Sequence, residues 1–175
     1  MENNTIYTIG YSTHTTDEFL ALLHAHEIQR LVDVRTIPRS RVQPQFGIDQ
    51  LPGILQAAGI EYTHLKELGG LRHAAKDSPN TGWRNASFRG YADYMATPEF
   101  HAGLVELEEL ARRQRTTIMC AEAVPWRCHR SLISDALTLA GWHVYHIMSK
   151  KTAREHTLTS FLRVEDGVIR YPGAE

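Results

Sequence analysis

The run Leu-Val-Asp-Val-Arg at residues 31–35 decides the fold, because it is short, mostly apolar and rich in β-branched residues. A strand of this kind is typical of a parallel sheet that is covered by helices on both faces. Similar runs occur at residues 5–11, 60–65, 116–120 and 143–147. Amphipathic stretches separate them. This alternation predicts an α/β sandwich of three layers, rhodanese-like or Rossmann-like, with a mostly parallel sheet of about five strands.

Helix signals lie between these strands. Capping hydroxyls and acids start a helix at residue 15, and a cap followed by proline and an acid starts another at Thr97-Pro98-Glu99. Glycines end two further helices, which are expected at residues 49–58 and 131–140. The tail from residue 149 is expected to form a helix and then a short strand at residues 168–171. Residues 67–90 show little periodicity and predict a long loop of the kind that lines a binding site, with regular structure resuming at Tyr91.

Length and composition indicate one globular domain over residues 1–175. Nineteen Lys and Arg against twenty Asp and Glu leave a net charge of −1, which does not support nucleic acid or an anionic membrane as a partner. The chain has no apolar run of about 18 residues, as a membrane helix would need. Its first residues are polar where a signal peptide would begin. We therefore expect a cytoplasmic protein without a membrane partner.

The residues that follow each predicted strand are rich in arginine, cysteine, histidine and hydroxyl groups. In folds of this class, ligands bind beyond the carboxyl ends of the strands, so these positions are the natural place for a site. Arginines there indicate an anionic small molecule as the ligand. The residues expected to bind it are Tyr11, Ser12, Arg35, Arg39, Arg41, Arg127 and Arg130.

Residues 120–131 carry the densest chemistry. Cys128 precedes a predicted helix beside His129, and the helix dipole and nearby positive charges favour its thiolate. Cys120 ends an apolar strand, where desolvation would raise its pKa. We therefore predict Cys128 as the nucleophile, with His129 and Glu122 transferring protons. The sequence leaves open that Cys120 attacks instead, or that one thiol attacks and the other resolves.

Two resemblances follow from these residues. The acid-Val-Arg strand and the strand-end Cys120 with its arginine-bearing loop resemble the rhodanese family, which implies Cys120 as nucleophile and persulfide transfer. The rhodanese loop is short, with its arginine about five residues past the cysteine. Here Arg127 and Arg130 lie seven and ten residues past Cys120, and the loop also contains Pro125 and a second cysteine.

The closer resemblance is to the bacterial family called domain of unknown function 488. That family has no settled activity, but the resemblance implies that its recurring motifs form one site. The motifs occur here in order, as Thr8-Ile9-Gly10-Tyr11-Ser12, Val32-Asp33-Val34-Arg35 with Pro38 and Ser40-Arg41, Leu68-Gly69-Gly70, Tyr91-Ala92-Asp93-Tyr94-Met95, Cys120-Ala121-Glu122 and Cys128-His129-Arg130.

Three functions of different classes remain open from the sequence. The first is an enzyme that acts on an anionic small molecule or on a sulfur or phosphoryl group, with Arg35, Arg41 and Arg130 as an anion clamp. The second is a non-catalytic module that binds an anionic ligand or a nucleic-acid phosphate. The third is a metal or redox protein that uses the two thiols. The ten histidines are scattered, so no metal ligands are assigned, and the sequence indicates no cofactor or oligomeric state.

Overall fold

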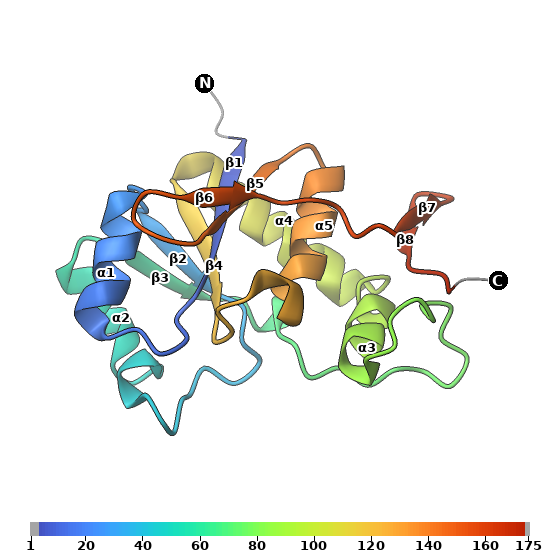
Figure 1. The fold of residues 1–175 in the computed structure, drawn as a ribbon, viewed down its shortest axis with the longest axis horizontal. Helices are drawn as coiled ribbons and strands as arrows, with labels where there is room; N and C mark the ends of the chain where they lie inside the picture. Colours follow the sequence, from blue (N-terminus) through green and yellow to red (C-terminus); the bar gives the residue numbers. More distant parts are fainter. Residues whose placement is uncertain (1–3, 174–175) are drawn as a thin grey trace.

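A computed structural model describes residues 4–173, in which a six-stranded sheet forms the centre of the molecule (Figure 1). The strand order is β3-β2-β4-β1-β5-β6, and every pair is parallel except β5 with β6. The α/β class and the mostly parallel sheet are therefore confirmed. The strands are β1 (Thr5–Gly10), β2 (Arg30–Asp33), β3 (Glu61–His64), β4 (Thr116–Cys120), β5 (His143–Ile147) and β6 (Ala153–Glu155).

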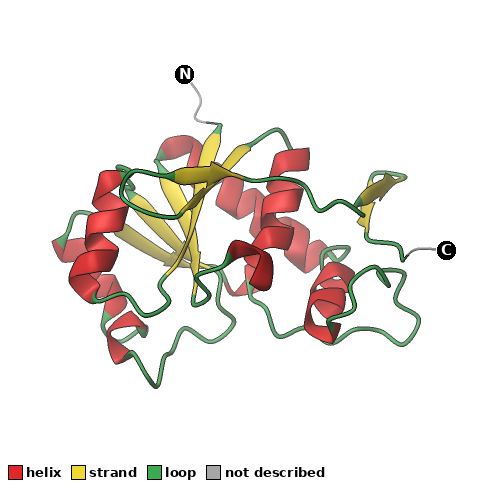
Figure 2. Cartoon of the chain, viewed as in Figure 1, coloured by secondary structure: helices red, strands yellow, loops and turns green. Residues whose placement is uncertain are grey.

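Helices cover both faces of this sheet, as Figure 2 shows. Adjacent strand residues point to opposite faces, so Leu31 packs in one core and Val32 in the other. The core of Leu31 includes side chains of α1 and α2, and the core of Val32 includes side chains of α3, α4 and α5. The helices are α1 (Thr16–Ala25), α2 (Leu51–Ala57), α3 (Ala86–Tyr94), α4 (Pro98–Arg113) and α5 (Arg130–Leu139), with short 3₁₀ turns η1 (Pro44–Phe46), η2 (Lys66–Leu68) and η3 (Pro125–Arg127).

The predicted helix starts are observed at α1 and α4. Thr15 and Glu18 form a capping box in which each side chain accepts from the other residue's backbone N–H. Thr97 caps α4, and Pro98 occupies its first turn. Residues 4–173 contain no helix that is both long and apolar enough to cross a membrane.

Two expectations about the less regular parts are wrong. The tail forms no helix within the described residues, because residues 153–155 pair with β5 as the edge strand β6. A hairpin of β7 (Arg163–Glu165) and β8 (Val168–Arg170) follows. Regular structure also resumes earlier than residue 91, since Asn85 caps α3 by accepting from the N–H groups of Ser87 and Phe88.

The parallel strands β1, β2 and β4 bring three chain segments to one edge of the sheet. Gly10 lies beside Cys120 in the β1–β4 ladder, and Asp33 lies beside Met119 in the β2–β4 ladder. The segment after Cys120 crosses directly over the end of β1. A Cβ atom on Gly10 would lie 1.8 Å from the carbonyl oxygen of Glu122, so this crossing requires glycine.

Candidate functional site

A cavity of about 320 Å³ lies at the carboxyl ends of β2 and β4. Its wall contains six of the residues singled out from the sequence: Arg35, Cys120, Glu122, Arg127, Cys128 and His129. The long connection after β3 and the start of α3 supply the other side, through Gly70, Leu71, Ser87, Phe88 and Tyr91. Among residues 4–173, the predicted site residues that do not line this cavity are Tyr11, Ser12, Arg39, Arg41 and Arg130.

The two cysteines meet at this cavity. Cys120 ends β4, and Cys128 lies in the turn between η3 and α5. Their sulfur atoms are 2.7 Å apart, both residues are buried and both thiols are free. Cys120 Sγ also lies 3.7 Å from the carbonyl oxygen of Glu122. The seven residues between the cysteines, 121–127, therefore form a closed loop that holds the sulfurs together.

The surroundings shift the pKa values of the two thiols in opposite directions. A hydrogen bond from the Cys120 thiol lowers the pKa of Cys128 well below its ordinary value; His129 and the backbone N–H of Arg130 add to this, and burial opposes it. Burial raises the pKa of Cys120 well above its ordinary value, and the neighbouring Cys128 raises it further. Cys128 is thus the thiol that ionises first.

His129 is oriented to take the proton of Cys128. Its Nε2–H donates to the carbonyl oxygen of Val34 at 2.7 Å, which leaves Nδ1 facing Cys128 Sγ at 3.6 Å. Burial alone would lower the pKa of His129, but the contact with Cys128 raises it above its ordinary value. A Cβ atom on Gly70 would lie 3.2 Å from Nδ1, and the ring of Tyr91 packs 5.0 Å away, so the imidazole is held on both sides.

Arg35 is committed to an ion pair inside the protein. Its Nε and Nη2 donate to the two carboxylate oxygens of Asp33 at 2.9 and 2.7 Å, and Nη2 also donates to the carbonyl oxygen of Phe46. Tyr11 is buried beside it and stacks on Phe46 with ring centroids 4.4 Å apart. The sequence gives Asp33 no role beyond its place in a family motif, although residues two apart on a strand share a face and Asp33 and Arg35 carry opposite charges.

Arg130 binds the loop between the two cysteines, residues 121–127 (the cysteine loop), and lies outside the cavity wall. Its Nη2 donates to the carbonyl oxygens of Glu122 and Ala123 at 2.8 and 2.9 Å, and its Nη1 donates to Thr8 Oγ1 at 2.9 Å. The side chain is 1% exposed, so it shapes the loop and does not face the cavity. The contact of Thr8 with Arg130 has no signal in the sequence, because the fold brings the two residues together.

The remaining predicted residues lie at the surface or beside the site. Arg39 and Arg41 are exposed. Ser12 takes a positive φ of 45°, and its backbone N–H donates to the carbonyl oxygen of Ala121 at 2.8 Å. Arg127 is exposed where it lines the cavity, so its guanidinium is accessible to a ligand.

The site thus offers a thiolate, a histidine beside it, a second thiol in contact and one accessible cation. Glu122 is exposed, and its Oε1 accepts from the backbone N–H of Val124 at 3.3 Å. Across the described chain, no three or more His, Cys, Asp or Glu side chains cluster in a way that could hold a metal ion.

Comparison with known proteins identifies a family. The profile of the family described as domain of unknown function DUF488 matches residues 15–137, which run from the start of α1 to α5 and include both cysteines, His129 and Arg35. No curated protein and no protein of solved structure matches the chain, and the resemblance to rhodaneses gains no support. Since the matched segment is well over half of the chain, the protein belongs to the DUF488 family.

Proposed function

We propose that this protein is a thiol-dependent enzyme that acts on an electrophilic sulfur atom of a small anionic substrate. The observation that carries the proposal is the contact of two free sulfurs at 2.7 Å, with the pKa of Cys128 lowered and that of Cys120 raised. A nucleophilic thiolate next to a protonated second thiol is the arrangement that thiol–disulfide exchange requires.

The reaction proceeds in two exchanges. The Cys128 thiolate attacks one sulfur of a substrate disulfide, which forms a mixed disulfide and breaks the substrate S–S bond. The other half of the substrate leaves as a thiolate. Cys120 then attacks the Cys128 sulfur, forms the Cys120–Cys128 disulfide and releases the second half. The substrate disulfide is reduced to two thiols, the protein dithiol is oxidised, and a cellular dithiol returns the protein to its reduced form.

His129 accepts and donates the protons that are transferred in these steps. In the resting site it takes the proton of Cys128 on Nδ1, because Nε2–H is already used by the carbonyl oxygen of Val34. The resulting imidazolium stabilises the thiolate and can protonate the leaving thiolate. After Cys120 has reacted, its proton replaces the one that His129 gave up.

The loop geometry favours sulfur over phosphoryl chemistry. A phosphoryl group needs several free N–H donors around the nucleophile to stabilise its oxygens. Pro125 has no N–H, and the N–H groups of Val124, Arg127 and Cys128 already donate within the loop. The carbonyl oxygens of Glu122 and Ala123 are taken by Arg130. The N–H groups of Val124, Arg127 and Cys128 are therefore not free to surround a phosphoryl group.

The volume and the lining of the cavity suit a small substrate. Its volume of about 320 Å³ lies in the range of small-molecule sites. Ile37, Leu71 and Phe88 provide apolar surface, and Arg127 provides accessible positive charge at the same wall. A compact organic disulfide with a carboxylate directed toward Arg127 fits this chemistry.

An aromatic disulfide that bears carboxylates and releases a coloured thiolate tests the proposal. The chain contains no cysteines besides Cys120 and Cys128, so every reaction is assignable. Wild-type protein should release both halves of the reagent and end with an internal disulfide. Cys120→Ser should release one half and retain the other on Cys128. Cys128→Ser should react slowly at neutral pH.

A titration of the two thiols can refute the proposal. Alkylation rates measured against pH should show a wild-type thiol that ionises well below the ordinary value of about 8.5. If both thiols titrate near that value, the nucleophile is absent. The cavity then stands as a binding site for an anionic ligand, whose affinity should fall with salt and with Arg127→Ala.

A further inference from the structure

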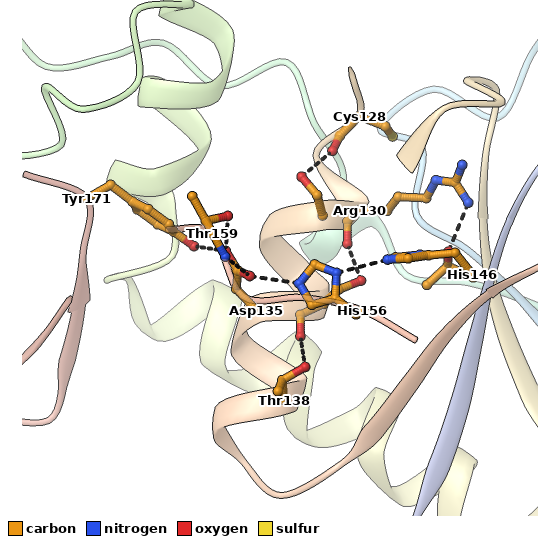
Figure 3. Close-up of polar contacts among 11 residues, drawn as sticks. Cys128, Arg130, Asp135, Thr138, His146, His156, Thr159 and Tyr171 are labelled. Carbon is orange, nitrogen blue, oxygen red and sulfur yellow. Dashed lines mark hydrogen bonds and ion pairs between the residues drawn. The ribbon is translucent and has the colours of Figure 1, made fainter. Parts of the chain in front are cut away.

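A second group of buried polar residues lies behind the cysteine loop, on β1, β5, α5 and the segment after β6 (Figure 3). His156 Nε2 lies 2.8 Å from Asp135 Oδ1, and His156 Nδ1 lies 2.9 Å from His146 Nε2. His146 Nδ1 lies 2.5 Å from Thr8 Oγ1, which also contacts Arg130 Nη1. These residues form one continuous chain of hydrogen bonds from a carboxylate to a guanidinium.

The two ends of this hydrogen-bond chain fix the bonds that they make. A guanidinium can only donate, so the Thr8 hydroxyl accepts from Arg130, and a carboxylate can only accept, so His156 donates from Nε2 to Asp135. In the order in which Thr8 gives its own proton to His146 Nδ1, His146 carries its proton on Nε2 and donates to His156. This order requires a neutral His146. Burial lowers the pKa of His146 to about 3, and His156, Arg130 and Arg154 contribute to the same shift.

The chain joins two buried opposite charges that do not touch. Asp135 is 0% exposed and Arg130 is 1% exposed. Over residues 4–173, Arg130 forms no ion pair with a carboxylate. A buried charge without compensation is costly, so the polarised bridge of Thr8, His146 and His156 provides what a direct ion pair would otherwise supply.

The carboxylate end of the chain is firmly anchored. Asp135 Oδ1 accepts from the backbone N–H of Thr159 at 3.1 Å. Asp135 Oδ2 accepts from the hydroxyls of Thr159 and Tyr171 at 2.7 and 2.8 Å. The Asp135 end of the hydrogen-bond chain is therefore fixed by the C-terminal segment of the protein. Arg130 is the end whose position can change when a hydrogen bond of the chain is removed.

Arg130 connects this chain to the two sulfurs. Its Nη2 donates to the carbonyl oxygens of Glu122 and Ala123, two and three residues past Cys120, and its backbone N–H lies against the Cys128 thiolate. The loop between the cysteines also lies between two cavities. One is the thiol cavity, and the other, of about 300 Å³, is lined by Pro125, His146 and His156 among others.

We propose that Thr8, His146, His156 and Asp135 are positioning residues, which hold Arg130 against the cysteine loop and thereby keep the two sulfurs in contact. This inference rests on the proposed thiol chemistry and names residues that never touch the substrate. When the bridge is broken, Arg130 loses its link to Asp135, the loop carbonyls lose their donor, and the Cys120 thiol no longer supports the Cys128 thiolate.

The hydroxyl of Thr8 gives the sharpest test, because it can be removed without a change of shape. Thr8→Val deletes the hydroxyl, and Thr8→Ser keeps it. Thr117→Val is the matched control, since Thr117 is equally buried on the neighbouring strand β4 and its hydroxyl donates to the backbone carbonyl oxygen of Ile118 at 3.3 Å. The readouts are the ultraviolet titration of the thiolate and the release of the second half of the aromatic disulfide.

We expect Thr8→Val to raise the apparent pKa of the first thiol to ionise. It should also slow the second release about ten-fold, as the loss of one hydrogen bond to a charged group would. Thr8→Ser should restore both readouts, and Thr117→Val should leave them at the wild-type level. Unchanged titration and release in folded Thr8→Val would overturn the inference, whereas an ordinary thiol pKa in wild-type protein would refute the proposed function itself.

If Thr8→Val does not fold, His156→Gln tests the inference at the other end of the hydrogen-bond chain. His156 lies outside the helices and strands, and although its side chain is only 7% exposed, glutamine keeps a polar group at this position. A raised thiol pKa and slower release in His156→Gln support the inference. Wild-type values for both readouts contradict it.

Discussion

Gly10→Ala is the substitution that most directly tests how the cysteine loop is held. The added Cβ would lie 1.8 Å from the carbonyl oxygen of Glu122, 2.5 Å from its carbonyl carbon and 3.0 Å from Ala123 Cα. Ordinary contacts of a Cβ atom lie at 3.4–4 Å, so the loop backbone has to move by more than one ångström. All three atoms belong to main chain, so no side-chain rotation can relieve the clash.

The structure sets the size of the expected effect. Overpacking in a rigid region costs about 1–3 kcal/mol. Moving the carbonyl of Glu122 also weakens its hydrogen bond from Arg130 at 2.8 Å, and hydrogen bonds to charged groups contribute about 1.5–3 kcal/mol. We therefore expect Gly10→Ala to lower the free energy of unfolding by about 3–5 kcal/mol and to separate the two sulfurs.

Urea unfolding and the aromatic disulfide reagent measure the two consequences. Gly53→Ala is the control, because a Cβ at that position in α2 meets nothing within 4 Å and alanine favours a helix. Gly53→Ala should keep or slightly raise stability and retain release of both halves of the reagent. If Gly10→Ala matches Gly53→Ala in stability and in release, the close approach of the loop to β1 is refuted.

Three further predictions concern His129, Gly70 and His146. His129→Gln should slow alkylation of Cys128 at neutral pH about ten-fold, because the thiolate loses its cationic partner; equal rates would contradict the pairing. Gly70→Ala should raise the pKa of Cys128, measured by thiolate absorbance, because its Cβ would press on His129 Nδ1 from 3.2 Å. His146 has its folded pKa lowered to about 3, so the unfolded chain binds a proton that the folded chain does not. As the pH is lowered from about 6 to about 3, the free energy of unfolding of the wild-type protein should therefore fall more steeply than that of His146→Phe. The expected difference in slope is about 1.4 kcal/mol per pH unit in urea unfolding.

The central strands could be predicted from sequence because their apolar β-branched runs are local signals. The run at residues 31–35 overlaps the strand β2 (Arg30–Asp33), which the structure ends at Asp33. Val34 then accepts from His129, and Arg35 lines the cavity. The edge strand β6 has only three residues and depends on pairing with β5. Local propensity does not report such pairing, so the tail was predicted as a helix.

The thiol site was predictable to the extent that its chemistry is local. The neighbours of Cys128 in sequence, His129 and Arg130, do contribute to lowering its pKa, through a side chain and a backbone N–H. The largest contribution comes from Cys120, and the short sulfur contact arises only when the loop closes. The contact of Thr8 with Arg130 spans 122 positions of sequence and has no local signal.

The arginines show why the position of a residue after a strand does not settle its task. Arg35 and Arg130 are both buried, and their guanidinium groups donate to Asp33, to Thr8 and to backbone carbonyls. A substrate would have to displace these internal acceptors, whereas the exposed Arg127 needs to lose only water. Arg130 therefore fixes the loop that brings the sulfurs together, Arg35 pairs with Asp33 at the end of β2, and we propose that Arg127 is the residue that recognises an anion at this cavity.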